Sequence, residues 1–113
     1  MKQIEHEEIK LELDGMLFTW NDEKEKINIR KHNMDFKTAA SVFIDSALFV
    51  EYNSTDDHTG EERFDAIGAI GGDTTIFVVY VERITVNDND IIRIISARKT
   101  TKEERRKYVN GYR

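Results

Sequence analysis

Three short runs of strand-forming residues, separated by turn residues, restrict the fold of this chain more than any other feature. The runs cover residues 63–70, 74–83 and 91–98, and the turn segments 71–73 and 87–90, rich in Gly, Asn and Asp, lie between them. Val, Ile, Tyr and Phe between such turn residues are typical of strands. Because the connections are short, neighbouring strands are expected to pair antiparallel. The sequence therefore predicts a three-stranded antiparallel meander.

The residues before this meander predict a hairpin, two helices and a short strand. Asp14-Gly15 between two apolar runs is a strong hairpin signal. Asn21 can cap a helix whose first turn is acidic and whose last turn is basic, and Asn33 can end it in a left-handed conformation. A second helix should carry an apolar stripe at i, i+3, i+4 and i+7 (Phe36, Ala39, Ala40 and Phe43), and a strand at 48–52 follows it.

The C-terminal residues predict a third helix. Thr100 or Thr101, with Glu103 or Glu104 three residues later, forms a capping box for a helix that extends to about Asn110. The order of elements predicts an α+β fold in which an antiparallel sheet packs with two N-terminal helices and a C-terminal helix. With 113 residues, the chain is expected to form a single domain over 1–113, with 1–15 as an acidic N-terminal extension or edge strand.

Charge is segregated along the chain. Residues 91–113 carry eight Lys and Arg against two Glu, whereas residues 45–62 carry six carboxylates and no Lys or Arg. Segregated charge can build a basic face that attracts phosphate, although a net charge of −5 is by itself typical of a domain that avoids nucleic acid. The absence of cysteine excludes disulfides. No signal peptide or transmembrane segment is recognisable, so a cytoplasmic protein is expected.

Three arginines of the predicted meander fall on one face if each hairpin is symmetric about its turn. Arg63 then lies opposite Val81, Val81 lies opposite Arg93, and Arg83 lies two residues further along the central strand. Planar and permanently charged guanidinium groups are well suited to bind phosphate. The alternative is that these arginines are solvated or neutralised by nearby carboxylates, for which the choices are Glu62, Asp65 and Glu82.

Few other residues point to chemistry. His32, at the end of a basic helix, could transfer protons or simply cap the helix. Trp20 and Tyr80 could stack on a nucleic-acid base or fill the core. The histidines are not spaced as metal ligands, so neither a metal nor another cofactor is expected; the sequence Asp56-Asp57-His58 is the one weak exception. Motifs of nucleotide hydrolases and acyl-transfer enzymes are absent from the sequence.

A set of residues over about 16–108 resembles the BrnT family of toxins from type II toxin–antitoxin systems. The run RIISARK at 93–99 and the Lys-His pair followed by Phe are its most specific parts. The matching residues are Phe18-Thr19-Trp20, Lys24, Asn28, Lys31-His32, Phe36, Ala39-Ala40, Val42-Phe43, Asp45, Glu62-Arg63-Phe64, Ile67-Gly68, Val78-Val79-Tyr80, Arg83, Arg93 to Lys99, Glu104-Arg105 and Tyr108. The chain differs from the family pattern at Asn21, Asn33 and Ser46, where Asp, Gly and Pro are usual.

The resemblance implies a RelE-like fold and an endoribonuclease that inhibits translation without a metal. It implies an RNA substrate and a BrnA-like ribbon-helix-helix antitoxin that neutralises the toxin in a hetero-oligomer, with DNA contacted only through the antitoxin and no membrane partner. The alternative is a non-catalytic module that binds RNA or protein, including a partner of a DNA-binding protein whose arginines receive an acidic antitoxin segment.

The resemblance and the predicted arginine face together assign roles to nine residues. Phosphate and transition-state binding fall to Arg63, Arg83 and Arg93, and proton transfer to His32 or Lys24. The expected RNA-binding residues are Trp20, Tyr80, Arg98 and Lys99.

Overall fold

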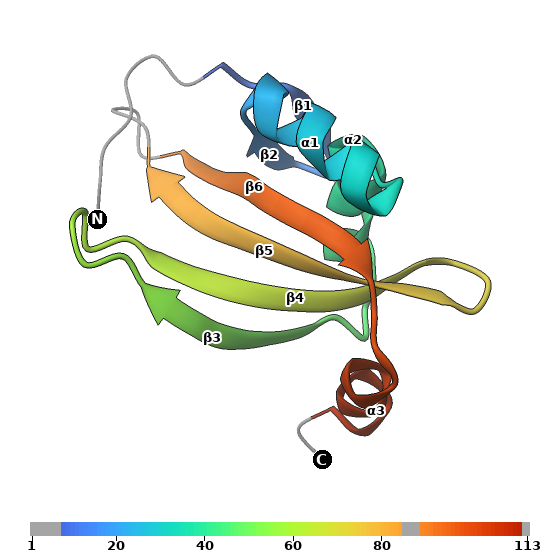
Figure 1. Ribbon diagram of the computed structural model, residues 1–113. Helices are drawn as coiled ribbons and strands as arrows, with labels where there is room; N and C mark the ends of the chain where they lie inside the picture. The colour runs from blue at the N-terminus through green and yellow to red at the C-terminus, as the bar shows by residue number, and fades with distance from the viewer. Residues whose placement is uncertain (1–7, 85–88, 112–113) are drawn as a thin grey trace.

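The computed structural model describes residues 8–84 and 89–111 (Figure 1). Within them lie a six-stranded sheet, three α-helices and a 3-10 helix. In chain order the elements are β1 (Leu11–Leu13), β2 (Met16–Thr19), α1 (Asp22–His32), α2 (Phe36–Ala40), the 3-10 helix η1 (Ser41–Ile44), β3 (Phe49–Thr55), β4 (Glu62–Gly71), β5 (Thr74–Ile84), β6 (Asp90–Lys99) and α3 (Lys102–Asn110). The mixed α+β class predicted from the sequence is confirmed.

The strands are ordered β1-β2-β6-β5-β4-β3 across the sheet. Each pair is antiparallel except β2 and β6, which run parallel. The prediction of an antiparallel sheet is therefore wrong at this one pair. The predicted antiparallel pairs are hairpins, whose short turns reverse the chain, whereas β2 and β6 are separated by two helices and three strands that leave either direction open.

The meander of β4, β5 and β6 has the predicted register. Arg63 pairs with Val81 and Val81 pairs with Arg93. A bulge interrupts the β5–β6 pairing between Val79 and Tyr80, at one extra residue of β6, without changing the register of the arginine positions. The turn predicted at 87–90 lies partly outside the described residues.

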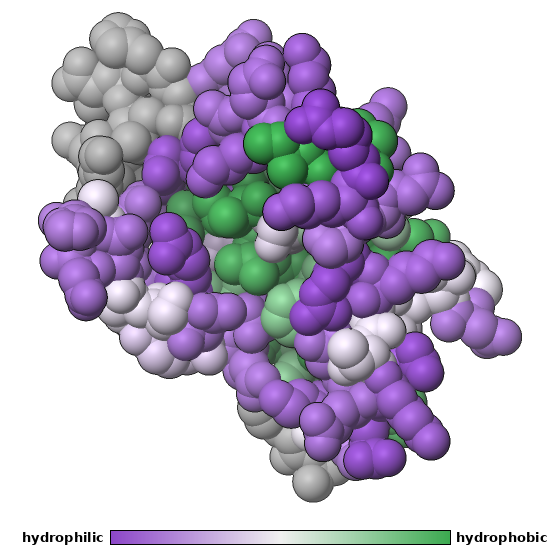
Figure 2. Space-filling model, viewed as in Figure 1, coloured by the Kyte–Doolittle hydropathy of each residue, from purple (hydrophilic) through white to green (hydrophobic). Residues whose placement is uncertain are grey.

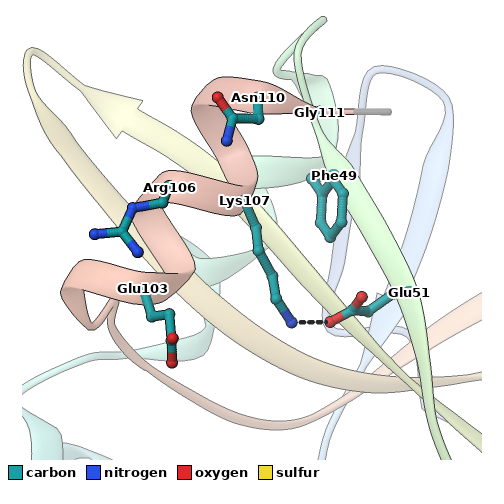
Figure 3. Close-up of a pocket in the computed structure, with 7 residues that line it drawn as sticks. All are labelled: Phe49, Glu51, Glu103, Arg106, Lys107, Asn110 and Gly111. Carbon is teal, nitrogen blue, oxygen red and sulfur yellow. Dashed lines mark hydrogen bonds and ion pairs between the residues drawn. The ribbon is translucent and has the colours of Figure 1, made fainter. Parts of the chain in front are cut away.

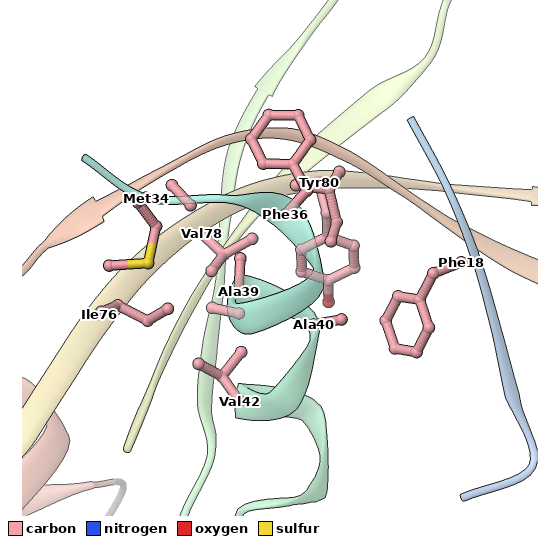
Figure 4. Close-up of a cluster of buried hydrophobic side chains, with 12 residues drawn as sticks. Phe18, Met34, Phe36, Ala39, Ala40, Val42, Ile76, Val78 and Tyr80 are labelled. Carbon is pink, nitrogen blue, oxygen red and sulfur yellow. The ribbon is translucent and has the colours of Figure 1, made fainter. Parts of the chain in front are cut away.

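One face of the sheet is covered by α2 and η1, and the core lies between these layers (Figure 4). The predicted stripe is buried at Phe36, Ala39 and Ala40, whereas Phe43 is only partly buried. The helix was expected to stay α-helical through Phe43, but it tightens into η1 after Ala40. The Ser41 hydroxyl donates to the Thr38 carbonyl at 2.6 Å, which competes with continued α-helical bonding.

The close approach of η1 to β4 depends on a glycine. A Cβ added at Gly68 would lie 2.8 Å from Val42 Cβ and 3.1 Å from the Val42 carbonyl oxygen. The absent side chain thus lets the 3-10 helix lie directly on the strand.

The two longer helices have the predicted caps. Asn21 accepts from the Lys24 amide at the start of α1, and Asn33 ends the helix with φ of 53°. Thr101 and Glu104 form the predicted capping box of α3. Figure 1 shows α1 lying along β6, with its C-terminus toward the end of that strand, and α3 beyond the end of the strand. No helix in the described part of the chain has the length and apolarity to cross a membrane.

Candidate functional site

Three arginines project from the sheet face opposite α2, which we call the arginine face. On β5, Ile76, Val78 and Tyr80 point into the core, so the alternate residues Val81 and Arg83 point to the other side. By the same alternation, Arg63 on β4 and Arg93 on β6 share that side, and Val81 between them is only 2% exposed. The view in Figure 2 shows a band of apolar side chains over the central strands, flanked by hydrophilic side chains.

Arg83 and Arg63 each pair with a carboxylate. Arg83 donates from Nε to Glu61 Oε2 at 2.8 Å and from Nη2 to Glu61 Oε1 at 3.2 Å. Arg63 Nη2 lies 3.6 Å from Asp56 Oδ2. The neutralising groups are therefore not the neighbours considered from the sequence. Glu62 and Glu82 are exposed at positions that alternate with the arginine face, and Asp65 accepts from Asn53 at 2.6 Å.

The loop between β3 and β4 places both carboxylates. The Asp56 amide donates to the Glu61 carbonyl at 2.8 Å, and the Gly60 amide donates to the Asp56 carbonyl at 2.9 Å, with Gly60 at φ of 76°. Asp56 Oδ1 accepts from the His58 and Thr59 amides at 2.8 and 3.0 Å. The hydrogen bonds from Thr59 and then His58, with a smaller contribution from nearby Arg63, hold the pKa of Asp56 below its ordinary value.

Glu61 and Asp56 were not predicted from the sequence as members of this site. The signal for Glu61 was available, because extending the Arg63–Val81 register by two residues places Glu61 opposite Arg83. Asp56 could not be found in this way, because it reaches Arg63 through a loop whose course local sequence does not determine.

The guanidinium group of Arg98 makes its contacts within the protein. It donates to Glu104 from two nitrogens at 2.8 and 2.9 Å, and its guanidinium carbon lies 4.4 Å from the centre of the Phe77 ring. The bond from Arg98 and the bond from the Thr101 amide outweigh burial and lower the pKa of Glu104. Arg98 therefore joins β6 to α3, while the neighbouring Lys99 is exposed at the end of the strand.

The predicted proton-transfer residues lie on α1. Asn28 on this helix bonds Ala97, four residues beyond Arg93, which corresponds to about 13 Å along β6. His32 lies a further turn in the same direction, so the structure separates it from the three arginines. Lys24 lies one turn before Asn28 and is exposed. Of these three positions of α1, only Asn28 is buried, against β6.

The two aromatic residues face the core side. Tyr80 is 4% exposed, and its ring meets Phe43 edge to face at 5.0 Å between centroids. Trp20 is half-buried and meets Phe36 in the same manner at 6.0 Å. This placement favours the core role that was the alternative to base stacking for both residues.

A hollow of about 360 Å³ lies between β3 and α3 (Figure 3). Lys107 spans it and bonds Glu51 at 2.7 Å, so its charges are mixed. Residues 8–84 and 89–111 contain no group of three or more His, Asp or Glu side chains arranged to hold a metal ion. The arginine face brings three guanidinium groups to one side of the sheet, an arrangement that can bind the phosphate of a phosphodiester.

Comparison with known proteins identifies the class as a toxin of a type II toxin–antitoxin system. The family described as "Ribonuclease toxin, BrnT, of type II toxin-antitoxin system" matches residues 20–104. The chain belongs to the BrnT family. Among solved structures, it is similar to the Brucella abortus ribonuclease toxin BrnT, with a TM-score of 0.50 and 25% identity over 74% of this chain and 94% of that chain. No curated protein matches the chain.

Proposed function

We propose that this protein is an endoribonuclease toxin with a RelE-like fold that cleaves RNA without a metal ion and thereby inhibits translation. The observation that carries the proposal is the convergence of Arg63, Arg83 and Arg93 on one sheet face in a member of a family described as ribonuclease toxins. We further propose that the whole chain, 1–113, acts as one domain in the cytoplasm.

The arginines supply the electrostatic part of the mechanism. Attack of a ribose 2′-oxygen on the adjacent phosphorus concentrates negative charge on the phosphoryl oxygens, and fixed guanidinium groups stabilise that charge. Arg63 and Arg93 flank Val81 in the register, and Arg83 lies one row further along, so a phosphate can contact cations from three strands. This arrangement needs no metal for charge stabilisation.

The remaining roles are proposed on the family motif. Lys24, on the turn of α1 nearer to Arg93, is better placed for proton transfer than His32. Lys99 is exposed at the end of β6 and can contact RNA away from the reacting phosphate.

We propose that a BrnA-like antitoxin with a ribbon-helix-helix DNA-binding region neutralises the toxin in a hetero-oligomer. The membership of a type II toxin–antitoxin family supports a protein antitoxin as the partner. DNA would then be contacted only through the antitoxin.

The test compares purified wild-type protein with Arg63→Ala and Arg83→Ala variants, incubated with RNA in EDTA. Arg30→Ala is the matched control, because Arg30 is an exposed arginine of α1. Wild type and the control should cleave RNA, and each test variant should lose at least about 100-fold in rate, as expected when a preorganised group that stabilises the transition state is removed. Full activity in both test variants, with their fold intact, would contradict the assignment.

A second candidate is a module that binds RNA without cutting it. The pairing of Arg83 with Glu61 and of Arg63 with Asp56 favours this reading, because a guanidinium that a carboxylate already neutralises stabilises the extra charge of a transition state less than an unpaired one. Retained RNA binding with intact RNA, in the wild-type protein, would establish this alternative.

A further inference from the structure

We propose that Glu61 is the general base of the RNA cleavage, deprotonating the ribose 2′-hydroxyl beside the phosphate that the arginines hold. This inference rests on the proposed ribonuclease function and adds a residue that the family resemblance did not include. It gives a role to the acidic segment before β4, which the arginine assignments left unexplained.

The contacts of Glu61 hold its carboxylate in one orientation. Arg83 donates hydrogen bonds to both carboxylate oxygens from one side, through Nε at 2.8 Å and Nη2 at 3.2 Å. Each carboxylate oxygen has two lone pairs, and the bonds from Arg83 occupy one on each oxygen. The second lone pair of each oxygen can accept a hydrogen bond from another donor. The Glu61 and Arg83 side chains are 17% and 15% exposed, so the pair is sheltered but still accessible from solvent.

The position of Glu61 beside the arginines also favours its role as the base. Glu61 lies across from Arg83, and Arg63 follows it by two residues on the same face, beside Val81 and Arg93. A phosphate between the arginines therefore brings its neighbouring ribose close to a fixed carboxylate. This reaction requires the base and the cations that stabilise the developing charge to lie on one surface. Glu61 and the arginine face meet this requirement.

The other described carboxylates near the arginines are less suited to the task. Asp56 is engaged by two loop amides through Oδ1 and faces Arg63 through Oδ2. Asp65 accepts from Asn53. Glu62 and Glu82 alternate onto the other side of the sheet.

The reaction balances in atoms and protons. The 2′-hydroxyl transfers its proton to a Glu61 oxygen while the 2′-oxygen forms a bond to phosphorus. The bond from phosphorus to the 5′-oxygen breaks, and the 5′-oxygen takes a proton from water. Glu61 then returns its proton to the resulting hydroxide, leaving a 2′,3′-cyclic phosphate and a 5′-hydroxyl.

The experiment measures single-turnover cleavage and binding of a short RNA by wild type, Glu61→Gln, Glu61→Asp and Glu61→Ala. Glu62→Gln is the matched control, because it removes the same charge one residue away on the opposite face. Binding is measured on a strand of the same sequence built with 2′-deoxyribose, which cannot react because it lacks the 2′-hydroxyl. Circular dichroism confirms that each variant is folded.

The cleavage rate of Glu61→Gln should fall about 100- to 10,000-fold, while its affinity for the unreactive strand stays equal or increases because a negative charge is lost. Glu61→Asp should recover part of the rate. Added chloroacetate, formate and acetate should rescue Glu61→Ala in that rising order, following the basicity of each carboxylate. A carboxylate that only orients Arg83 would give rescue without that order.

The outcomes separate this inference from the function on which it rests. Cleavage by wild type together with a Glu61→Gln rate within threefold would overturn the role of Glu61 alone, as would rescue that ignores basicity. A wild-type protein that leaves RNA intact, with or without ribosomes, would overturn the ribonuclease function and this inference together.

Discussion

The side-chain amide of Asn28 pairs with the backbone of Ala97 as a neighbouring strand would. Asn28 Nδ2 donates to the Ala97 carbonyl at 2.8 Å, and the Ala97 amide donates to Asn28 Oδ1 at 3.1 Å. A second bond from Nδ2 reaches the Met34 carbonyl at 2.9 Å. Because β2 pairs with β6 only as far as Arg93, α1 takes over the edge of β6 beyond that point, and one asparagine satisfies the strand there.

Replacing Asn28 with leucine should destabilise the protein by about 2 to 4 kcal/mol. Asn28 is 4% exposed, so the change leaves the amide and carbonyl of Ala97 and the carbonyl of Met34 buried without these partners. Urea denaturation followed by circular dichroism measures the loss. Asn53→Ala, which removes an exposed amide, should change the free energy of unfolding by less than about 1 kcal/mol. Equal losses in the two variants would contradict this account of Asn28.

The ion pair between Arg98 and Glu104 should make stability depend on pH. The pKa of Glu104 is lowered chiefly by its bond from Arg98, so its contribution is full above the ordinary glutamate range and is lost as the pH falls toward the folded-state pKa. Because the pair is partly exposed, Glu104→Gln should cost only about 1 kcal/mol at pH 7. The difference from wild type should shrink below about pH 5.

The control for that experiment is Glu103→Gln, on the same turn of α3. Its difference from wild type should be small. A Glu104→Gln difference that stays constant down to pH 3 would exclude the ion pair as its source.

Asp45 and Tyr108 join α3 to the end of η1. The Tyr108 hydroxyl donates to Asp45 Oδ2 at 2.6 Å, and the Ala69 amide donates to the same oxygen at 2.8 Å. Burial raises the pKa of Asp45, but these bonds and one from Ala47 together outweigh burial and lower it. Acidification below the ordinary aspartate range should therefore weaken the junction.

Tyr108→Phe should cost about 1 to 2 kcal/mol of stability, since it removes a hydrogen bond to a charged acceptor. It should also increase amide exchange in α3 more than in β5. Tyr52→Phe, an exposed tyrosine on the edge strand β3, provides the comparison for hydroxyl removal. Unchanged exchange in α3 would show that the bond does not hold this helix.

The sequence predicts the parts of the fold that local chemistry determines. The caps of α1 and α3 follow from Asn21 and Thr101, whose side chains can satisfy amides at a helix start only in one geometry. The register of the meander follows from its turns and alternation, so the arginine face was predictable. The position of η1 against β4 was not predictable, because it depends on the contact of Val42 with Gly68 across the core.

Long-range pairing sets the limit of prediction. Thr19 and Arg93 are paired in parallel strands although their local sequences contain no sign of each other. The partners of the arginines were mistaken for a related reason. Glu62 and Glu82 are sequence neighbours of the arginines, but side-chain alternation turns them away from the arginine face. Glu61 and Asp56 instead reach the arginines through the loop that joins β3 and β4.

The salt dependence of RNA binding should report how many RNA phosphates the arginine face contacts. For single-stranded RNA, the logarithm of the binding constant falls with the logarithm of salt concentration by about 0.7 per neutralised phosphate. Arg63→Ala and Arg83→Ala should each reduce this slope by about 0.7, whereas Arg30→Ala on α1 should leave it unchanged. Fluorescence anisotropy with an RNA blocked by 2′-O-methyl groups measures the slopes without cleavage. If the two variants keep the wild-type slope, the RNA backbone binds elsewhere on the protein.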